Sequence, residues 1–562
     1  RTVYRSAKGE WIVDFGQTLC GRARIRVDVP KGAELTFEYF EVTDWAGNYR
    51  NTMIAPQKDV YISNGSPCQY EAAFTFHGFR YLRVSGTESV HKEDFTAVAL
   101  STEKENLGAF ECSDPRLNRL YQNIRWSQRS NMLSIPTDCP SREKGGFTGD
   151  IQIYAKTAML NEEMTPFLTG WLKNLKAAQA ENGAVPITVP ETAPYRRLMA
   201  ANAREFGDEP PVGVAGWSDA AVLVPYTMYR LTGNRRILEE QYESMTHWCG
   251  YIIRTAEGRR GDSGLPHEVD SVLWNTGFHF GEWLIPSEEK GITQKEACQR
   301  SAFYTAPIFG YLSVKCMAEI AEVLQKPEKV YYSRTAGQMK AAIQTALICD
   351  GALRSQNMGA YVLMIAVDLV PEHCKEHFAQ KLISLLDSHH GCLDTGFLAT
   401  PFLLDAFVKI GRRDLAIKLL WQTRMPSWLY EVEQGATSVW ESWDAITPGS
   451  EPRITSYNHY AFGCVDAWIF ENIAGIRALE PGFRRVEIAP DPDGLPLEYC
   501  RRSFRCEYGD LLVFWDRQTL RVSIPCGVRA VIRWKGALHE VGSGEYTFTE
   551  PHRGGEQNER TG

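Results

Sequence analysis

The spacing of apolar residues changes twice along this chain, and these changes restrict the folds open to it. Up to residue 105, segments such as AELTFEYFEV alternate apolar with polar residues, the period of a half-buried β-strand. In residues 106–478, as in SDPRLNRLYQNIRWSQRSNML, apolar residues recur at the spacing of an amphipathic helix. Alternation returns in residues 479–562, for example in RRVEIAP and LRVSIP. The sequence therefore predicts a β-domain, a helical domain and a second β-domain.

Turn signals refine this prediction. Gly, Pro and Asn-Gly separate the short strands, so we expect β-sandwiches in residues 1–105 and 479–562. About a dozen helices in the central region are too many for a four-helix bundle, and the sequence shows no repeat typical of a solenoid. Helix pairs closed into an (α/α) toroid fit best. Beyond the first helix, the predicted helices are residues 151–160, 164–179, 217–232, 236–256, 305–325, 328–347, 372–387, 400–410, 412–424 and 458–474.

Composition argues against several classes of function. The 562 residues exceed the length of a single domain, and 44% of them are apolar, enough for a core in each domain. The net charge of −8 comes without a long basic run, so neither nucleic acid nor a membrane surface is an expected partner. No apolar stretch approaches the ~20 residues of a membrane span.

The cysteines and the first residues bear on the cellular compartment. The 14 cysteines are scattered without a C-x-x-C pair or zinc-ligand spacing, so we expect mostly reduced, buried thiols and neither metal nor cofactor. The opening residues lack the apolar core of a signal peptide, which favours a cytoplasmic location. The chain begins at Arg1 and not at Met, so we expect its natural start to lie upstream.

The segment Thr137–Asp150, TDCPSREKGGFTGD, is the best candidate for a catalytic loop. Asp138, Glu143 and Asp150 place three carboxylates among glycines and prolines, between two helical patterns. Such a loop presents acids from a rigid frame, although Asp and Gly are also frequent in ordinary turns. A second acid-bearing segment far downstream favours the catalytic interpretation.

Five segments of the helical region place Trp beside small residues, most of them with a carboxylate. Core packing explains any single ring, but the recurrence favours a carbohydrate cleft, where rings cover apolar sugar faces and carboxylates accept hydroxyl hydrogens. By contrast, we expect His77 and Arg80 in FHGFRY to lie on the exposed face of a strand, without a catalytic role. The candidate sugar-binding residues in the five segments are Trp217, Asp219, Trp274, Glu282, Trp283, Trp428, Trp440 and Trp443.

Several motifs together resemble a known family. DCPSREKGGFTGD, GWSDA, FGEWL, GFLATPFLL, VEQGATSVWESWD and SYNHYAFG occur in an order that resembles the inverting α-L-rhamnosidases of glycoside hydrolase family 78. DFGQTLCG and FTFHGFRYL resemble the β-sandwich that precedes the (α/α)6 barrel in that family, and the closing β-domain is also similar. The resemblance implies a multidomain hydrolase with a central (α/α)6 toroid, acting on a rhamnose-containing glycoside, oligosaccharide or polysaccharide.

The resemblance also assigns roles. Glu143 matches the general acid of the family, and Glu441 in WESW matches its general base. Phe147 stands where Trp is usual and Glu282 where Asp is usual, which implies an altered fit of the sugar pocket. The further residues that match the sugar site are Asp138, Arg142, Asp150 and His459.

The chemistry of these assignments can be stated independently. Inverting hydrolysis needs one protonated carboxyl group for the leaving oxygen and one carboxylate that activates water. We expect Glu143 to be protonated, because Asp138 and Asp150 repel its charge and aromatic rings partly bury it, with Arg142 and Lys144 opposing. Glu441 is expected to be ionised, and no metal is required.

Two alternatives stay open. A carbohydrate-binding protein that has lost catalysis would have the same Trp-rich, acid-rich cleft. Another (α/α) toroid enzyme, such as a debranching glucosidase or a polysaccharide lyase, would share the fold. The sequence specifies neither the aglycone nor the oligomeric state, for which a homodimer stays open.

Overall fold

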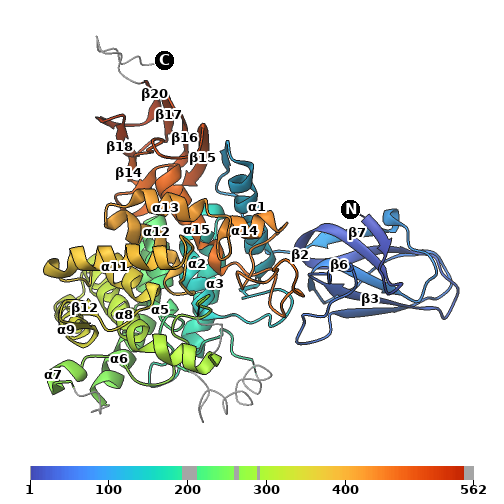
Figure 1. Ribbon diagram of the computed structural model, residues 1–562, viewed down its shortest axis with the longest axis horizontal. Helices are drawn as coiled ribbons and strands as arrows, with labels where there is room; N and C mark the ends of the chain where they lie inside the picture. The colour runs from blue at the N-terminus through green and yellow to red at the C-terminus, as the bar shows by residue number, and fades with distance from the viewer. Residues whose placement is uncertain (1, 193–211, 259–264, 288–291, 550–562) are drawn as a thin grey trace. The chain divides into compact units, whose positions relative to one another are not determined.

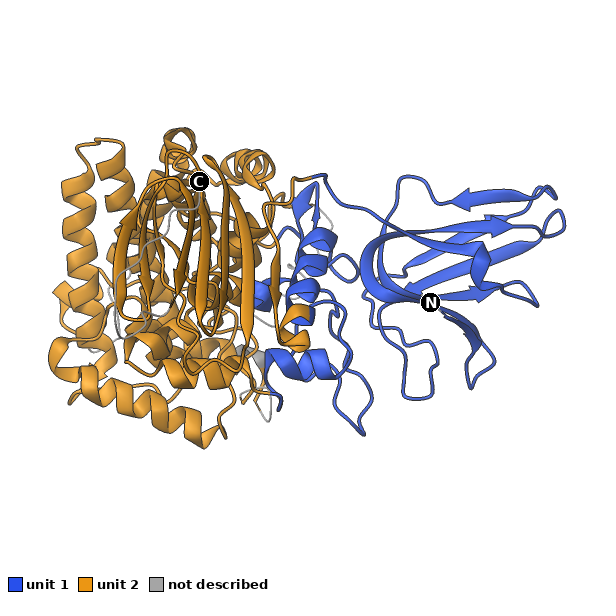
Figure 2. Ribbon diagram, turned by 90° about the horizontal axis from the view of Figure 1, so that it is seen from above, with its two compact units in different colours: residues 1–103, 119–146, 423–463 blue, residues 104–118, 147–422, 464–562 orange. Residues whose placement is uncertain are grey.

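The computed structural model describes residues 2–192, 212–258, 265–287 and 292–549 (Figure 1). It divides into two compact units, coloured separately in Figure 2. The first comprises residues 1–103, 119–146 and 423–463; the second comprises 104–118, 147–422 and 464–562. The first unit therefore joins the N-terminal sheet to both segments that carry the predicted catalytic glutamates.

The sheet of the first unit has seven strands in the order β1-β2-β6-β3-β4, with β5 and β7 also paired to β2. The long strand β2 contains an irregularity between Asp14 and Leu19, so that its first part pairs with β1 and its second part with β5 and β7. Buried residues of these strands, among them Phe37, Tyr39 and Leu82, form one core cluster. The strands are β1 (Thr2–Arg5), β2 (Trp11–Val27), β3 (Glu34–Phe40), β4 (Lys58–Ile62), β5 (Cys68–Glu71), β6 (His77–Ser85) and β7 (Phe95–Ala99).

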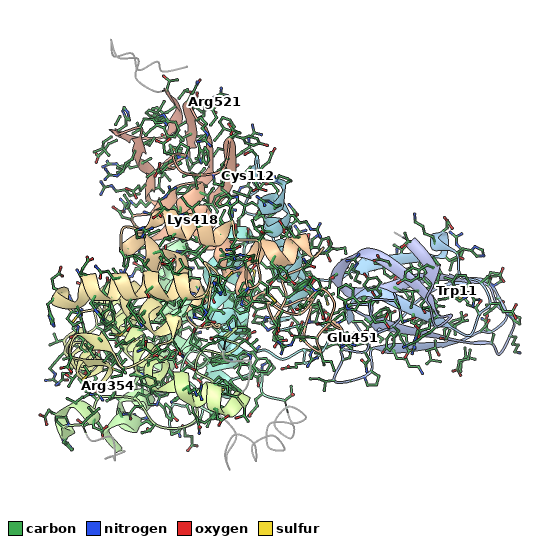
Figure 3. All side chains as sticks on the ribbon, in the orientation of Figure 1. Trp11, Cys112, Arg354, Lys418, Glu451 and Arg521 are labelled. Atoms are coloured by element: carbon green, nitrogen blue, oxygen red, sulfur yellow. The ribbon has the colours of Figure 1, made fainter. Side chains whose placement is uncertain are left out.

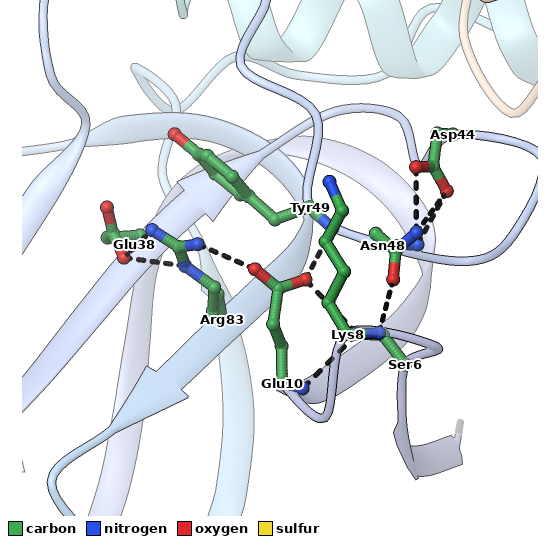
Figure 4. A network of polar contacts seen from close by, with 8 residues as sticks. All are labelled: Ser6, Lys8, Glu10, Glu38, Asp44, Asn48, Tyr49 and Arg83. Carbon is green, nitrogen blue, oxygen red and sulfur yellow. Dashed lines mark hydrogen bonds and ion pairs between the residues drawn. The ribbon is translucent and has the colours of Figure 1, made fainter.

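A polar network fixes the start of the connection between β3 and β4 (Figure 4). Glu10 binds Arg83 at 2.7 Å and accepts a hydrogen bond from the Tyr49 amide at 3.0 Å. Asp44 accepts from the Asn48 amide at 2.8 Å, which closes the turn. The network therefore ties this connection, through Tyr49, to Glu10 and to Arg83 of β6.

His77 and Arg80 do not lie on an exposed strand face, so that expectation was wrong. His77 is 4% exposed, and its ring nitrogens are bonded to Gln57 at 3.2 Å and Asp59 at 3.0 Å. Arg80, partly buried, makes a two-point contact with Asp14 at 3.0 and 3.2 Å. Both side chains are internal cross-links of the sheet.

The second unit contains most of the helices. Sequence neighbours pack against each other, as α5 does on α6, α8 on α9, and α12 on α13. The α-helices of this unit are α2 (Thr148–Asn161), α3 (Thr165–Ala178), α5 (Ala220–Thr232), α6 (Arg235–Gly258), α7 (His267–Asp270), α8 (Gln294–Val323), α9 (Lys329–Leu347), α10 (Met358–Ala366), α11 (Lys375–Ser388), α12 (Thr400–Lys409), α13 (Arg413–Leu420) and α15 (Val465–Trp468).

Every predicted helical segment contains helix, but some details differ. Helix α8 begins at Gln294, well before the expected residue 305, because Thr293 and Glu296 form a capping box. Helix α10 was missed, since it is buried over almost its whole surface and has no polar stripe. In the segment 458–474, a short α-helix lies between a 3-10 turn and a π-helical turn.

Two sheets close the second unit. The larger has the order β20-β17-β16-β15-β8, and Figure 3 labels Cys112 in β8 and Arg521 in β17. The smaller joins β13, β14, β18 and β19. The strands are β8 (Phe110–Cys112), β13 (Ile476–Ala478), β14 (Arg485–Ile488), β15 (Tyr499–Cys506), β16 (Gly509–Asp516), β17 (Thr519–Ile524), β18 (Arg529–Trp534), β19 (Ala537–Val541) and β20 (Gly544–Thr549).

A fully buried ion pair joins the larger sheet to the helices. Arg502 of β15 binds Asp466 of α15 at 3.1 Å, and neither side chain is exposed. Arg502 also donates to Asn161 of α2 at 3.4 Å. Removing one partner of such a pair leaves a buried charge uncompensated, a loss of about 3–5 kcal/mol. The pair therefore ties the C-terminal sheet to the helical part.

All 14 cysteines are free and most are buried, as predicted. Within the described ranges, no helix combines the length and the apolar character that crossing a membrane requires.

Candidate active site

The acid loop, residues 137–146, is closed by its own hydrogen bonds. The Asp138 amide donates to the Gly145 carbonyl at 2.9 Å, and the Gly145 amide donates to Asp138 Oδ1 at 2.8 Å. Between them, the Glu143 amide donates to Cys139 Sγ at 3.3 Å, and Lys144 adopts a left-handed conformation with φ of 54°. The loop therefore presents Glu143 from a short closed frame whose base is the buried Asp138.

The N-terminal sheet supports the acid loop. A Cβ added at Gly78 of β6 would lie 2.7 Å from the Ser141 Cβ atom and 2.9 Å from Pro140, so only glycine permits this approach. Arg142 donates to the Thr52 carbonyl at 2.5 Å, and Lys144 donates to the Phe76 carbonyl at 2.7 Å. The acid loop thus lies directly against the sheet.

The second acid comes from the base loop, residues 435–460, which follows helix α14 (Trp428–Glu433). The Glu441 amide donates to the Ser456 carbonyl at 3.1 Å. The Glu441 carboxyl atom Oε2 accepts hydrogen bonds from Thr455 Oγ1 and the Ser456 amide, each at 3.0 Å. The His459 amide donates to the Val439 carbonyl at 2.8 Å, so residues 439–441 and 456–459 hold each other. These contacts orient the Glu441 carboxylate.

Helix α1 (Pro115–Asn131) connects the two loops. Asn131, at its end, donates from its side chain to the Asn458 carbonyl at 3.1 Å. Thr137 donates to Asn131 Oδ1 at 3.0 Å, and the Val439 amide donates to Ser127 Oγ at 2.8 Å. The last turn of one helix therefore fixes residues on both acid-bearing loops.

Electrostatics distinguish Glu143 from an ordinary carboxylate. Burial raises the pKa of Glu143 well above its usual value, and repulsion by Asp138 and Glu441 adds to the rise. Arg142 and His459 oppose it. Lys144, which was expected to oppose the rise, donates a hydrogen bond to the Phe76 carbonyl. Glu441, and not the expected Asp150, is the second acid that repels the charge of Glu143.

Glu143 is nevertheless an exposed side chain. The side chain is thus open to solvent while its carboxyl group has protein on most sides. Such a group is accessible to a ligand while its charged form is poorly hydrated. A carboxyl group of this kind can donate a proton to a bound molecule.

The structure thus brings together several predicted residues in the first unit. Asp138, Arg142, Glu441 and His459 all influence the charge of Glu143. Three other predicted residues in this unit, Trp428, Trp440 and Trp443, are 1–3% exposed.

These three rings have packing partners. Trp428 donates to the Phe462 carbonyl at 2.9 Å, and Trp443 stacks on Phe462 with ring centroids 4.4 Å apart. Trp440 packs edge-to-face on Tyr457 at 5.8 Å. Core packing therefore accounts for them, and little ring surface is left for the predicted stacking on a sugar.

Further predicted residues belong to the second unit. Asp150 lies in the first turn of α2, where a carboxylate is favoured by the helix dipole. Trp217 is buried beside Gly149, where an added Cβ would come within 2.6 Å of the indole ring. Phe147 and Trp283 are only partly buried, so their predicted contact with sugar stays a prediction.

Two other predicted residues of this unit, Asp219 and Trp274, contact residues within the protein. Asp219 is fully buried and accepts hydrogen bonds from the Gly216 amide at 2.7 Å, Trp248 at 3.0 Å and Ser313 at 2.5 Å. Trp274 is 1% exposed and packs edge-to-face on Trp248. These contacts give Asp219 and Trp274 a structural role and leave them little access to a ligand.

Glu282, which stands where Asp is usual, is also bonded internally. It is 1% exposed, and its carboxylate accepts from the Gly396 amide at 2.8 Å and the Ala399 amide at 2.6 Å. The longer side chain therefore holds the turn that leads into helix α12. This contact explains the residue without a sugar ligand.

Sequence reasoning missed two buried acids of the first unit, Glu41 and Glu431. Glu431 of α14 accepts from the Trp440 amide at 3.3 Å, and burial raises its pKa well above the usual value. Glu41 accepts from the Tyr457 amide at 3.2 Å, and burial raises its pKa to about 7. Glu41 sits in the EYFEV strand pattern, where a polar residue at a strand end carries no functional signal.

Over the described residues, no group of three or more His, Cys, Asp or Glu is placed to hold a metal ion.

Comparison with known families gives matches over almost the whole chain. Residues 4–101 match the bacterial alpha-L-rhamnosidase concanavalin-like domain. Residues 105–473 match the bacterial alpha-L-rhamnosidase 6 hairpin glycosidase domain, and residues 475–543 match the corresponding C-terminal domain.

Individual relatives agree with this result. An alpha-L-rhamnosidase of Streptomyces avermitilis is 33% identical over 98% of this chain and 52% of its own length. One from Formosa agariphila is 31% identical over 93% of this chain and 54% of its own. The chain therefore spans about half the length of these curated relatives.

Solved structures are similar as well. The Streptomyces avermitilis alpha-L-rhamnosidase complexed with L-rhamnose has a TM-score of 0.87 at 32% identity, covering 98% of this chain and 53% of its own. The alpha-L-rhamnosidase of Aspergillus terreus has a TM-score of 0.87 at 31% identity, covering 98% of this chain and 63% of its own.

The charge state of Glu143 gives a prediction about stability. Because its folded-state pKa lies above the ordinary value of 4.5, the folded protein loses stability as pH rises through and above that value. Glu143→Gln cannot ionise, so its melting temperature should exceed that of the wild type by more at about pH 8 than at about pH 4. Thermal unfolding at both pH values measures the difference.

Glu10→Gln is the control, because its effect on stability should depend on pH in the opposite direction. The pKa of Glu10 is lowered by hydrogen bonds from the Tyr49 amide, Arg83 and Ser6, although its partial burial opposes them. Its contribution is present above the unfolded pKa and lost at low pH, so this substitution should destabilise the protein more at about pH 8 than at about pH 4. A gain for Glu143→Gln that is equal at both pH values would contradict the assigned charge state.

Proposed function

Because the chain belongs to the bacterial α-L-rhamnosidase family, glycoside hydrolase family 78, we propose that it hydrolyses α-L-rhamnosides with inversion at the anomeric carbon. The observation that carries this proposal is the pair formed by Glu143 and Glu441. The pKa of Glu143 is raised, and Glu441 is oriented by two hydrogen bonds within the same unit. A protonated acid and an oriented carboxylate are the two groups that inverting hydrolysis requires.

The reaction follows from these roles. Glu441 takes a proton from a water molecule, which attacks the anomeric carbon of the rhamnose ring. Glu143 gives its proton to the glycosidic oxygen as the bond to the aglycone breaks, so the products are free rhamnose and the alcohol. A water must fit between the sugar and Glu441, so the two carboxyl groups are expected to stand about 6.5–9.5 Å apart.

Raising the pKa of Glu143 is what makes it a useful acid. A carboxylic acid with an ordinary pKa would be almost fully ionised at neutral pH and could not donate. Asp138 lies at the base of the acid loop and repels the charged form of Glu143. We assign Asp138 this tuning role in addition to holding a sugar hydroxyl, together with Asp150, His459 and Arg142.

The substrate is a terminal, non-reducing α-L-rhamnose on a glycoside, oligosaccharide or polysaccharide. L-Rhamnose is the ligand of the solved relative from Streptomyces avermitilis. Phe147 and Trp283 keep accessible ring surface and are the aromatic candidates for sugar contact. Glu282 holds the turn at residues 396–399.

The domain organisation is part of the same proposal. Residues 106–478 form an (α/α)6 toroid, with β-sandwich domains in residues 1–105 and 479–562. The neighbour packing of α5 with α6, α8 with α9 and α12 with α13 supports a toroid built of helix pairs. The 6 hairpin description of the matching family model supports it as well.

A chromogenic substrate tests the activity. The protein should release nitrophenol from p-nitrophenyl α-L-rhamnoside and leave the corresponding α-glucoside intact, because L-rhamnose is the proposed sugar. Release from the glucoside alone would refute the rhamnosidase assignment. Binding of L-rhamnose without any hydrolysis would indicate a carbohydrate-binding protein instead.

Substitution of the two glutamates tests their roles. Glu143→Gln and Glu441→Gln should each reduce kcat by about 10²–10⁴-fold, the usual contribution of a general acid or base. A nitrophenyl leaving group needs little protonation, so it should restore the Glu143 variant far more than the Glu441 variant. Circular dichroism controls for the fold, and wild-type activity in either variant would remove that residue from the mechanism.

A further inference from the structure

Glu41, which comes from the N-terminal sheet, contacts the segment that orients Glu441. It directly follows β3, and its side chain is 3% exposed. Its carboxyl atom Oε2 accepts a hydrogen bond from the Tyr457 amide at 3.2 Å. The preceding amide, that of Ser456, donates to Glu441 at 3.0 Å. Consecutive amides of one segment therefore bind the carboxyl groups of Glu41 and Glu441.

Glu41 also faces the acid loop. The Ser141 hydroxyl and the Arg142 guanidinium both stabilise its charged form. Ser141 is fully buried and immediately precedes the pair Arg142 and Glu143. The hydroxyl lies near the carboxyl group without the geometry of a full hydrogen bond, since neither Glu41 Oε1 nor Ser141 Oγ has a partner among the described residues. Glu41 thus stands between the segments that carry the two proposed catalytic acids.

We infer that Glu41 is a positioning residue for the proposed hydrolysis and forms a bridge between the two loops, because it accepts a hydrogen bond from Tyr457, in the segment that orients Glu441, and lies beside Ser141 in the loop that carries Glu143. The inference rests on the proposed function for its effect on catalysis. The bridge itself is a property of the free protein. It makes the N-terminal β-domain part of the catalytic machinery.

The protonation state of Glu41 affects the stability of this site. Burial raises the pKa of Glu41 to about 7, repulsion by Glu441 acts in the same direction, and the Tyr457 amide, Ser141 and Arg142 oppose the rise. The charged and titratable groups that face it are Arg142 on the acid loop, and Glu441 and Tyr457 on the base loop. Below neutral pH the neutral carboxyl group fits this site. Above neutral pH the charged carboxylate is poorly hydrated and repels Glu441, so the site loses stability, although Tyr457, Ser141 and Arg142 favour the charged form.

Hydrogen exchange tests the bridge without any substrate. In the full chain, Glu41→Ala should increase amide exchange at least about 10-fold in both segments 138–146 and 453–460, because local opening there becomes easier. Glu41→Gln should keep the protection, since its amide oxygen can accept from Tyr457. Glu71→Gln is the matched control, as it removes a carboxylate of the same sheet that binds Arg22 and Arg24. This substitution should leave the amide exchange of both segments unchanged.

Kinetics then test the effect on the reaction. Glu41→Ala should lower kcat for p-nitrophenyl α-L-rhamnoside by about 10- to 100-fold, the loss expected when a catalytic group is misplaced by about 1 Å. KM should change less, because the proposed sugar contacts Asp150, Phe147 and Trp283 lie outside both segments. The ratio of kcat for Glu41→Gln to that of the wild type should rise from about pH 6 to about pH 8, since glutamine cannot ionise.

The outcomes separate the two proposals. Increased exchange in both segments with Glu41→Ala, and protection with Glu41→Gln, support the bridge whether or not the protein hydrolyses rhamnosides. Unchanged exchange in either segment overturns it, even if the wild type is an active rhamnosidase. An activity ratio that stays constant with pH overturns the dependence on Glu41 charge. Absence of hydrolysis by the wild type refutes the proposed function alone.

Discussion

The burial of the Glu143 carboxyl group beside other carboxyl groups is the constraint on which the proposed chemistry depends. Poor hydration raises the pKa of Glu143 most, and repulsion by Asp138 and Glu441 adds to this effect. Carboxylates placed together repel one another, so the protein must hold them in position. The closed acid loop, the paired segments of the base loop and the end of helix α1 provide this support. The same contacts that stabilise the fold of the first unit therefore set the charge state of the proposed acid.

The first unit also shows why the N-terminal sheet matters to the site. Gly78 lets Pro140 and Ser141 approach β6, Thr52 and Phe76 accept hydrogen bonds from Arg142 and Lys144, and Glu41 reaches the base loop. A domain without a role in the site would not be expected to place a buried carboxyl group, that of Glu41, against the base loop. We therefore regard residues 1–103 as a structural component of the site.

The sequence predicted the order of elements well, because hydrophobic period is a local property. It missed helix α10, because a helix buried on almost all sides has no polar stripe. It also misjudged His77, because the partners of this side chain come from elsewhere in the chain: Asp59 lies in β4 and Gln57 directly precedes that strand. The grouping of Glu143 with Glu441 and His459 came from the motifs and not from spacing. Residues such as Asp219 and Glu41 could not be sorted in advance, since only the structure shows which donors their carboxyl groups face. Trp beside Gly or Ser proved a signal of packing as much as of ligand binding.

The central claim is that Glu441 activates water while Glu143 supplies the proton, which inverts the anomeric carbon. Proton NMR of the first sugar released from an α-L-rhamnoside, recorded before mutarotation, tests this most directly. We expect β-L-rhamnose to form first and the α anomer to grow only as the sugar equilibrates. Initial formation of α-L-rhamnose would mean that the anomeric carbon is displaced twice. Glu441 would then act as a nucleophile, in contradiction to the mechanism proposed.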